Sequence, residues 1–290
     1  MNRQSFFKSL FFAAALSASV LTGCGQKHSY TETEIVNFAD SSDLVIFSMQ
    51  VELPVVFDEV SDKIRKDLLS IVKEDFDGMA YDEQAIYEMD VEDSLSSESF
   101  VTRFGEATFS SLNRLAQDDS DMREIEIQED EDFELHDFQW ECIYNLNRVL
   151  DEDRYCVFYS EMYQYLGGMH GGISGSGYIT YSKADGRRVT GILDPDAVME
   201  MQDLLVQGIA RYFAESGEEI PEDQVINYLF IEDGIIPLPK NEPYLSEDGL
   251  TLIYQQYEIA PYVIGMPQFT IPYDEVRPFM TEEARKLLGM

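Results

Sequence analysis

A histidine inside a glycine-rich segment is the residue of this sequence that most invites a chemical interpretation. Six glycines and His170 lie between Tyr165 and Gly177. Because glycine adopts positive φ angles without a Cβ clash, the segment predicts a tight corner between two strands, formed by Tyr165, Gly167, Gly168 and His170. Two roles are open for the His170 ring: it hydrogen-bonds to backbone and locks the corner, or it takes part in a reaction. We favour the first, because buried polar groups are normally hydrogen-bonded.

No other motif in the sequence assigns a reaction. The three histidines, His28, His136 and His170, lack the spacing of a zinc site, and no Gly-x-Ser-x-Gly, P-loop or dinucleotide-binding pattern is present. We therefore predict no metal ligand, no cofactor and no catalytic residue. The alternative that we keep is an envelope hydrolase in which His170 works with a carboxylate, Glu258 being the candidate.

The first 24 residues predict export and a lipid anchor. Arg3 and Lys8 precede an apolar run that is too short to span a bilayer, and Leu21-Thr22-Gly23-Cys24 follows it. This pattern resembles a bacterial lipobox, which implies a signal peptide over residues 1–23 and diacylation of Cys24. The alternative is an ordinary secretory peptide. Two acyl chains anchor a protein stably, so we expect a cell-envelope protein held at a membrane surface, with residues 24–40 as a polar tether.

The chain is strongly acidic, with 20 basic and 56 acidic residues and a formal net charge of −36. Without the two basic residues that precede Cys24, 18 basic residues remain against 56 acidic ones. Such a surface repels phosphates, so nucleic-acid binding is excluded as a function. It attracts a cationic partner and accelerates the encounter at low salt. Solubility of an exported protein is the simpler explanation of the same charge.

Hydrophobic periodicity divides the rest of the chain into helices and strands. Spacings of three and four predict helices over residues 58–76, 100–115 and 194–217, with shorter ones over 221–228 and 274–288. Alternation and Asp-Gly turns predict strands over residues 44–56, 138–149, 154–166, 177–181, 187–192, 243–245, 250–257 and 269–273. Helices and hairpins follow one another without βαβ spacing. We therefore predict an α+β fold with a mainly antiparallel sheet of hairpins and helices packed on it.

Two local expectations concern charge and cysteines. The acidic stretch 117–134 is predicted to be a solvated loop, because blocks of like charge stay exposed and no EF-hand pattern is present.

Cys142 and Cys156 lie at different distances from the turn of one predicted hairpin. They should not face each other across the strands, so we expect two buried thiols and no disulfide.

Several separated motifs resemble one extracytoplasmic module. They are Tyr165-Leu166-Gly167-Gly168-Met169-His170-Gly171, Tyr178-Ile179-Thr180-Tyr181, Leu193-Asp194-Pro195, Asp248-Gly249-Leu250, Tyr257-Glu258-Ile259-Ala260-Pro261-Tyr262 and Ile271-Pro272-Tyr273. In this order they are similar to the module shared by RsiV-like anti-sigma factors and PdaC-like proteins, whose C-terminal part is a domain of unknown function. The resemblance divides the chain into a PdaC-like part over residues 41–192 and an RsiV C-terminal-like part over 193–290, packed as one unit.

The resemblance implies a binding or sensing protein. In RsiV this module binds lysozyme, so the sharpest expectation is a non-enzymatic lipoprotein that recognises a cationic protein such as lysozyme, or cell-wall glycan. The residues that the resemblance places at the recognition surface, or at a structural corner, are Tyr165, Gly167, Gly168, His170, Tyr257, Glu258, Pro261 and Tyr262. Glu258 is also expected to accept hydrogen bonds at its bend.

Overall fold

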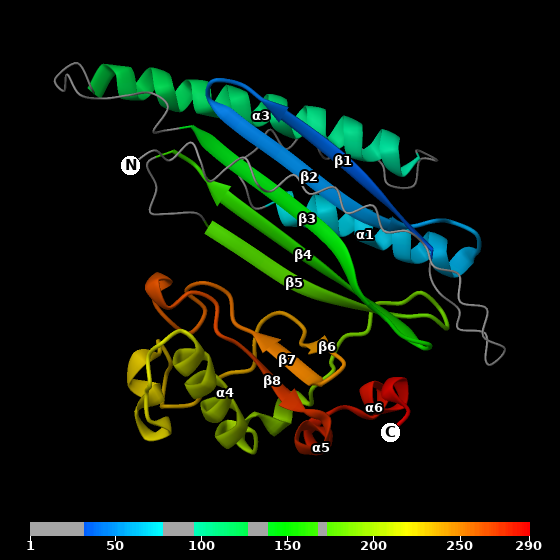
Figure 1. Ribbon diagram of the computed structural model, residues 1–290, viewed down its shortest axis with the longest axis vertical. Coiled ribbons are helices and arrows are strands. Elements are labelled where there is room, and N and C mark those ends of the chain that lie inside the picture. The colour runs from blue at the N-terminus through cyan, green and yellow to red at the C-terminus, as the bar shows by residue number, and fades with distance from the viewer. Residues whose placement is uncertain (1–31, 78–95, 127–138, 168–172) are drawn as a thin grey trace.

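A five-stranded and a three-stranded sheet organise this protein (Figure 1). The computed structural model describes residues 32–77, 96–126, 139–167 and 173–290, and only the backbone of residues 122–126 and 173–176. The first sheet contains β1 (Thr33–Ser41), β2 (Val45–Pro54), β3 (Trp140–Asp151), β4 (Tyr155–Tyr165) and β5 (Ile173–Ser182). The second contains β6 (Tyr244–Leu245), β7 (Gly249–Ile253) and β8 (Gln268–Pro272).

Helices flank the two sheets. The α-helices are α1 (Glu59–Asp77), α3 (Ser97–Glu126), α4 (Gln202–Glu215), α5 (Tyr273–Val276) and α6 (Glu282–Leu288). The 3₁₀-helices are η4 (Pro195–Met199), η5 (Glu222–Tyr228), η6 (Tyr262–Ile264) and η7 (Arg277–Phe279). In the first sheet only the β2–β3 pair is parallel, and the other neighbours are antiparallel. The predicted α+β class with a mainly antiparallel sheet is confirmed.

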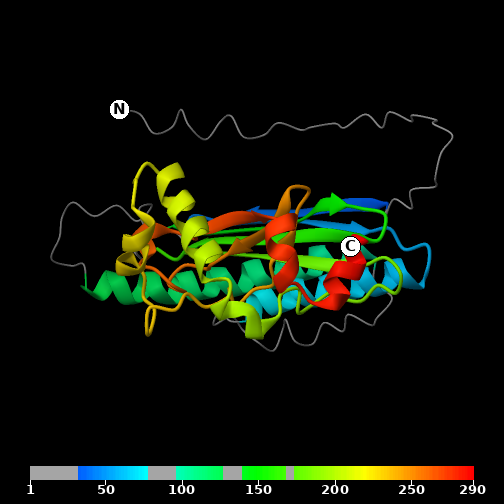
Figure 2. The ribbon, with the colours of Figure 1, turned by 90° about the horizontal axis from the view of Figure 1, so that it is seen from below.

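The first core lies between the five-stranded sheet and helices α1 and α3, which cover one face of it (Figure 2). The helix predicted from residue 58 is confirmed as α1, and Asp58 caps it by accepting a hydrogen bond of 2.7 Å from the Ser61 amide. Along β2 the alternating residues Val45, Phe47, Met49 and Val51 are buried against these helices. The alternating apolar residues of β2 thus point to the face of the sheet that the helices cover.

The second core lies around the three-stranded sheet and extends onto one end of the first sheet's opposite face. Tyr155 and Val157 of β4 belong to this core, while their neighbours Cys156 and Phe158 belong to the first. A bulge between Arg148 and Leu150 also turns Leu150 towards the second core. The C-terminal part therefore packs on the β3–β4 turn, and towards the other end of that face the side chains of Tyr159, Tyr163 and Tyr165 are partly exposed.

Several turn and cap predictions are confirmed. The β3–β4 and β6–β7 hairpins form as expected, and Asp194 caps the next helix by accepting from the Asp196 amide at 3.0 Å. The hairpin at Asp185-Gly186 also forms, although its second arm contributes only the bridge between Tyr181 and Arg188. The single helix predicted over 194–217 is in fact two, η4 followed by α4.

The prediction for the two cysteines is confirmed. Cys142 and Cys156 are both buried and free. They lie opposite Gln164 and Asp151 respectively, at the two ends of the β3–β4 pair. Burial raises the pKa of each thiol to about 12, so both stay protonated at neutral pH.

Two predictions about exposed segments are wrong in part. The second half of the predicted tether, residues 24–40, is the strand β1, because Val36 and Phe38 pack against the first core and the backbone pairs with β2. The acidic stretch 117–134 is helical as far as Glu126, since α3 continues through it. Residues 127–134 lie outside the described part.

No helix among the described residues is both long and apolar enough to cross a membrane.

Candidate functional site: a tyrosine face

The partly exposed end of that face of the first sheet carries a row of tyrosines. Because side chains alternate along a strand, Phe158 and Met162 of β4 enter the first core, whereas Tyr159, Tyr163 and Tyr165 point to the other face. Five tyrosines from the first sheet and the C-terminal part gather on that face, and two more come from the corner at 257–262. We call this set the tyrosine face: Tyr159, Tyr163, Tyr165, Tyr178, Tyr244, Tyr257 and Tyr262.

Ring contacts connect the tyrosine face across the two sheets. The ring centroids of Tyr159 and Tyr178 are 4.7 Å apart, and Tyr178 stacks on Tyr244 at 4.2 Å with an interplanar angle of 11°. Burial raises the pKa of Tyr178 to about 12, with Tyr159 and Tyr244 adding to the shift. These phenols are therefore neutral hydrogen-bond donors at physiological pH.

The corner at 257–262 has a strained and well-supported backbone. Tyr257 has a φ of 64°, an uncommon value for a residue with a side chain, and 63% of it is exposed. Its ring lies 5.8 Å from that of Tyr262, which starts η6 directly after the cap residue Pro261. Glu258 accepts a hydrogen bond of 2.7 Å from the Lys240 amide and another of 2.7 Å from the Gln255 amide. Both carboxylate oxygens of Glu258 thus support the corner, as the sequence predicted.

Tyr262 of the corner lies near Tyr163 of strand β4, although 99 positions separate these two residues in the sequence. Burial raises the pKa of the Tyr163 phenol, and the nearby Glu141, Tyr262 and Tyr165 raise it further. Two residues that the sequence singled out, Tyr165 and Tyr262, consequently share one surface.

The acidic side chains Glu141 and Glu161 lie among these rings. Glu161 is close enough to Tyr178 to raise the pKa of its phenol, and partial burial raises the pKa of Glu141 itself. Half-buried tyrosines beside carboxylates suit recognition: rings stack on a sugar or a guanidinium group, and carboxylates attract cations. Ring stacking and charge attraction are therefore the interactions that this face offers to a partner.

The other residues that the sequence assigned have mixed outcomes. Gly167 has a φ of 42°, as the predicted corner requires. Gly168, His170 and Cys24 lie outside the described residues. Sequence reasoning missed Tyr159, Tyr163 and Tyr178 as surface residues, although their alternation in two predicted strands carried the signal.

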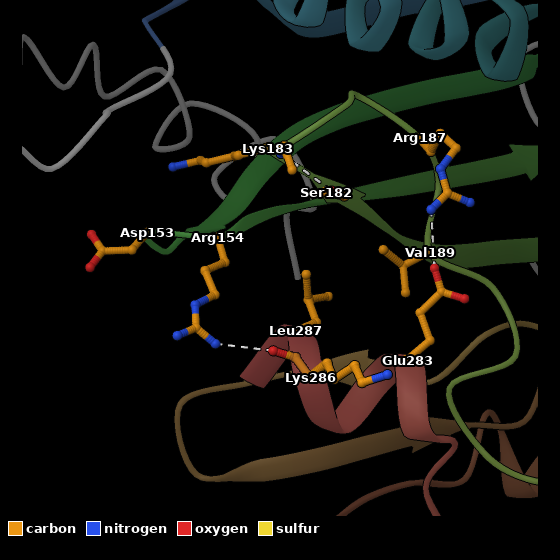
Figure 3. Close-up of a pocket in the computed structure, with 10 residues that line it drawn as sticks. Asp153, Arg154, Ser182, Lys183, Arg187, Val189, Glu283, Lys286 and Leu287 are labelled. Carbon is orange, nitrogen blue, oxygen red and sulfur yellow. Dashed lines mark hydrogen bonds and ion pairs between the residues drawn. The ribbon is translucent and has the colours of Figure 1, made fainter. Parts of the chain in front are cut away.

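A basic hollow near the C-terminal helix is a second place to consider. It encloses about 420 Å³ between the β3–β4 turn, the end of β5 and α6 (Figure 3). Arg154 donates to the Lys286 carbonyl oxygen at 3.0 Å, and Arg187 pairs with Glu283 at 3.1 Å. Lys183 is paired with Asp151 at 2.6 Å. These cations already have partners, so the hollow is best explained as the junction that ties α6 to the first sheet.

Comparison with known proteins finds a family model that matches the C-terminal part of the chain. Residues 192–274, which contain the second sheet and the 257–262 corner, match the family described as "Protein of unknown function (DUF3298)". None of the curated proteins matches the chain.

Two solved structures share the fold. A member of the DUF3298 family from Bacteroides fragilis is 17% identical, with a TM-score of 0.65 over 90% of this chain and 98% of that one. A DUF3298 family protein from Pseudomonas aeruginosa PAO1 is 14% identical, with a TM-score of 0.51 over 88% of this chain and 95% of that one. At these identities the similarity shows the fold alone.

Proposed function

We propose that this protein is a lipid-anchored cell-envelope protein that binds or senses a partner and catalyses no reaction. The observation that carries the proposal is the tyrosine face, an aromatic surface with carboxylates on a chain of net charge −36. Tyrosine is enriched at the residues that dominate binding energy, because it buries a large ring at low entropic cost and keeps a polar tip. The partner that fits this surface best is a cationic protein, and lysozyme is the cationic protein to test first.

Calorimetry of the full-length protein with lysozyme tests this version. We expect binding at low salt and a several-fold loss of affinity at physiological salt, because screening weakens attraction between exposed charges. Tyr163→Ala and Tyr262→Ala should each weaken binding by about tenfold, as expected for aromatic anchors. Phe57→Ala is the matched control: this aromatic is 61% exposed and lies at the opposite end of the sheet, beyond Pro54.

The outcomes separate the versions of the proposal. An absence of heat with lysozyme at both salt concentrations rejects the cationic-protein version. The glycan version is then tested with chitooligosaccharides, whose binding should depend on the same two tyrosines and hardly on salt. If neither ligand binds, or if Phe57→Ala weakens binding as much as Tyr163→Ala, the tyrosine face is not the recognition surface.

The lipid anchor is a separate prediction. Metabolic labelling with a fatty-acid analogue should mark the wild-type protein, and Cys24→Ser should remove the label and release the protein from the membrane fraction. Cys142→Ser serves as the control, because that thiol is buried. Labelling that persists in Cys24→Ser would refute acylation at this residue.

The hydrolase alternative has no observation in its favour among the described residues. Its proposed carboxylate, Glu258, already accepts backbone hydrogen bonds with both oxygens.

A further inference from the structure

A pocket of about 270 Å³ lies at the β5 edge of the first sheet, next to the end of α1. The C-terminal half of α1 and the edge strand β5 form two of its walls, and the segments 188–190 and 240–242 form the others. We call it the seam pocket, defined by Asp75, Ser160, Gly177, Thr180, Arg188 and Asn241. Its volume corresponds to about nine water molecules, so it suits a ligand the size of one monosaccharide.

Asp75 is a carboxylate with neutral hydrogen-bond donors. The Tyr144 hydroxyl donates to it at 2.8 Å, and the Ser160 hydroxyl also donates to it. Burial raises the pKa of Asp75 and Glu74 adds to the rise, while the two hydroxyls and Arg188 lower it. Burial is the largest of these effects, so the contacts within the protein compensate the buried charge only in part.

The nearest cation to Asp75 is Arg188, which already pairs with other carboxylates. Arg188 donates through Nε to Asp67 at 2.6 Å, and its Nη2 lies 3.7 Å from Glu74. On the opposite wall Lys240 is exposed, and Glu242 accepts hydrogen bonds from the Gly191 and Ile192 amides. Three carboxylates, Glu74, Asp75 and Glu242, line this pocket against two cations, Arg188 and Lys240, so the excess is negative.

A glycine leaves the pocket open to a ligand. Gly177 leaves space beside Ser160, since a Cβ there would lie 3.8 Å from the Ser160 Oγ and 3.6 Å from the Asn241 Nδ2. Any larger side chain at 177 would enter the space that a ligand needs.

We propose that the seam pocket binds a small molecule through a primary ammonium group, which pairs with Asp75 beside Ser160. The ammonium supplies the full positive charge that the protein does not give this carboxylate, and a hydroxyl group on the ligand reaches Asn241. An amino sugar and a lysine-type alkylamine both carry this group. Tyr178 of the tyrosine face also lines this pocket, but Asp75, Ser160 and Asn241 do not belong to that face, so either proposal can fail alone.

Calorimetry of the full-length protein with glucosamine, N-acetylglucosamine and n-butylamine at neutral pH tests the proposal. We expect glucosamine to bind and N-acetylglucosamine, which lacks the charge, to bind at least tenfold more weakly. Binding of n-butylamine without glucosamine assigns the site to a lysine side chain instead of a sugar. Affinity should fall as the pH drops through the pKa of Asp75, because the protonated acid loses the ion pair.

Variants make the test specific. Asp75→Asn keeps the size of the side chain but removes its charge and should weaken glucosamine binding at least tenfold. Gly177→Leu should abolish it by filling the pocket, and Gly177→Ala, whose contacts are of ordinary length, should weaken it less. Glu161→Gln on the tyrosine face is the charge-matched control and should change nothing. Circular dichroism checks that each variant is folded.

Three results would overturn the proposal. The first is that neither ammonium compound binds, and the second is that N-acetylglucosamine binds as well as glucosamine. The third is that folded Asp75→Asn binds with unchanged affinity.

Discussion

Replacing Phe76 with alanine should lower the free energy of unfolding by about 3–5 kcal/mol, the range for truncating a buried aromatic ring. Phe76 is 1% exposed. Its ring lies 5.2 Å from Tyr144, 5.3 Å from Phe104 and 6.2 Å from Phe47. These partners come from β3, α3 and β2, so one ring near the end of α1 joins four elements of the first core. Alanine would leave a cavity that no single neighbouring element can close.

Urea denaturation followed by tryptophan fluorescence measures this loss. Trp140, the one tryptophan of the sequence, packs against the first core and reports on its unfolding. Phe57→Ala, at a site 61% exposed, should change stability by no more than about 0.5 kcal/mol. Phe76→Leu, which keeps most of the volume, should lose about 1 kcal/mol. A loss below about 1 kcal/mol for Phe76→Ala would mean that the core closes around the gap, contrary to the packing described.

Local signals explain which elements the sequence predicted correctly. Helix α1 begins where Asp58 caps it, and strand β2 shows a clean alternation of buried residues. The turns at Asp185-Gly186 and Asp248-Gly249 mark their hairpins within two residues. Each of these signals acts between neighbours in the chain, so no knowledge of the tertiary structure is needed to read it.

Long-range packing explains the elements that the sequence did not reveal. Strand β1 has only Val36 and Phe38 as an alternating pair, and its strand form depends on pairing with β2. The extension of α3 to Glu126 runs through a block of acids that suggested a loop. Parallel pairing of β2 with β3 joins residues about 95 positions apart, as for Val45 and Trp140. None of these contacts leaves a pattern within a short window of sequence.

The candidate sites also divide into features with a local sequence signal and features that depend on long-range packing. The resemblance singled out Tyr165, Tyr257 and Tyr262, but not that Tyr262 would lie beside Tyr163. The seam pocket was not predicted at all, because Asp75, Ser160 and Arg188 come from three separate elements. A surface on one strand can be read from alternation, whereas a pocket between elements depends on how they pack.

Replacing Gly249 with alanine should destabilise the second core by about 3 kcal/mol, the upper end of the range for forcing extra atoms into packed structure. Gly249 follows the turn at Asp248, and its carbonyl oxygen accepts hydrogen bonds from the Ser246 amide and hydroxyl at 2.9 and 2.8 Å. A Cβ at this position would lie 2.2 Å from the Ile271 carbonyl oxygen and 2.8 Å from its carbon. Both are backbone atoms of the paired strand β8, so no rotamer change relieves the clash.

Gly191 provides the matched control for the same substitution. It has a φ of 65°, and a Cβ added to it would meet no atom within 4 Å, so Gly191→Ala should cost only the left-handed backbone penalty of about 1–2 kcal/mol. Chemical denaturation monitored by near-ultraviolet circular dichroism, which reports on Tyr254 and its neighbours in the second core, compares the two variants. If Gly249→Ala costs no more than Gly191→Ala, strands β7 and β8 can separate locally, and the close approach at Ile271 does not hold the hairpin. The larger loss at Gly249 is expected because a backbone carbonyl, unlike a side chain, cannot move without breaking the ladder that it belongs to.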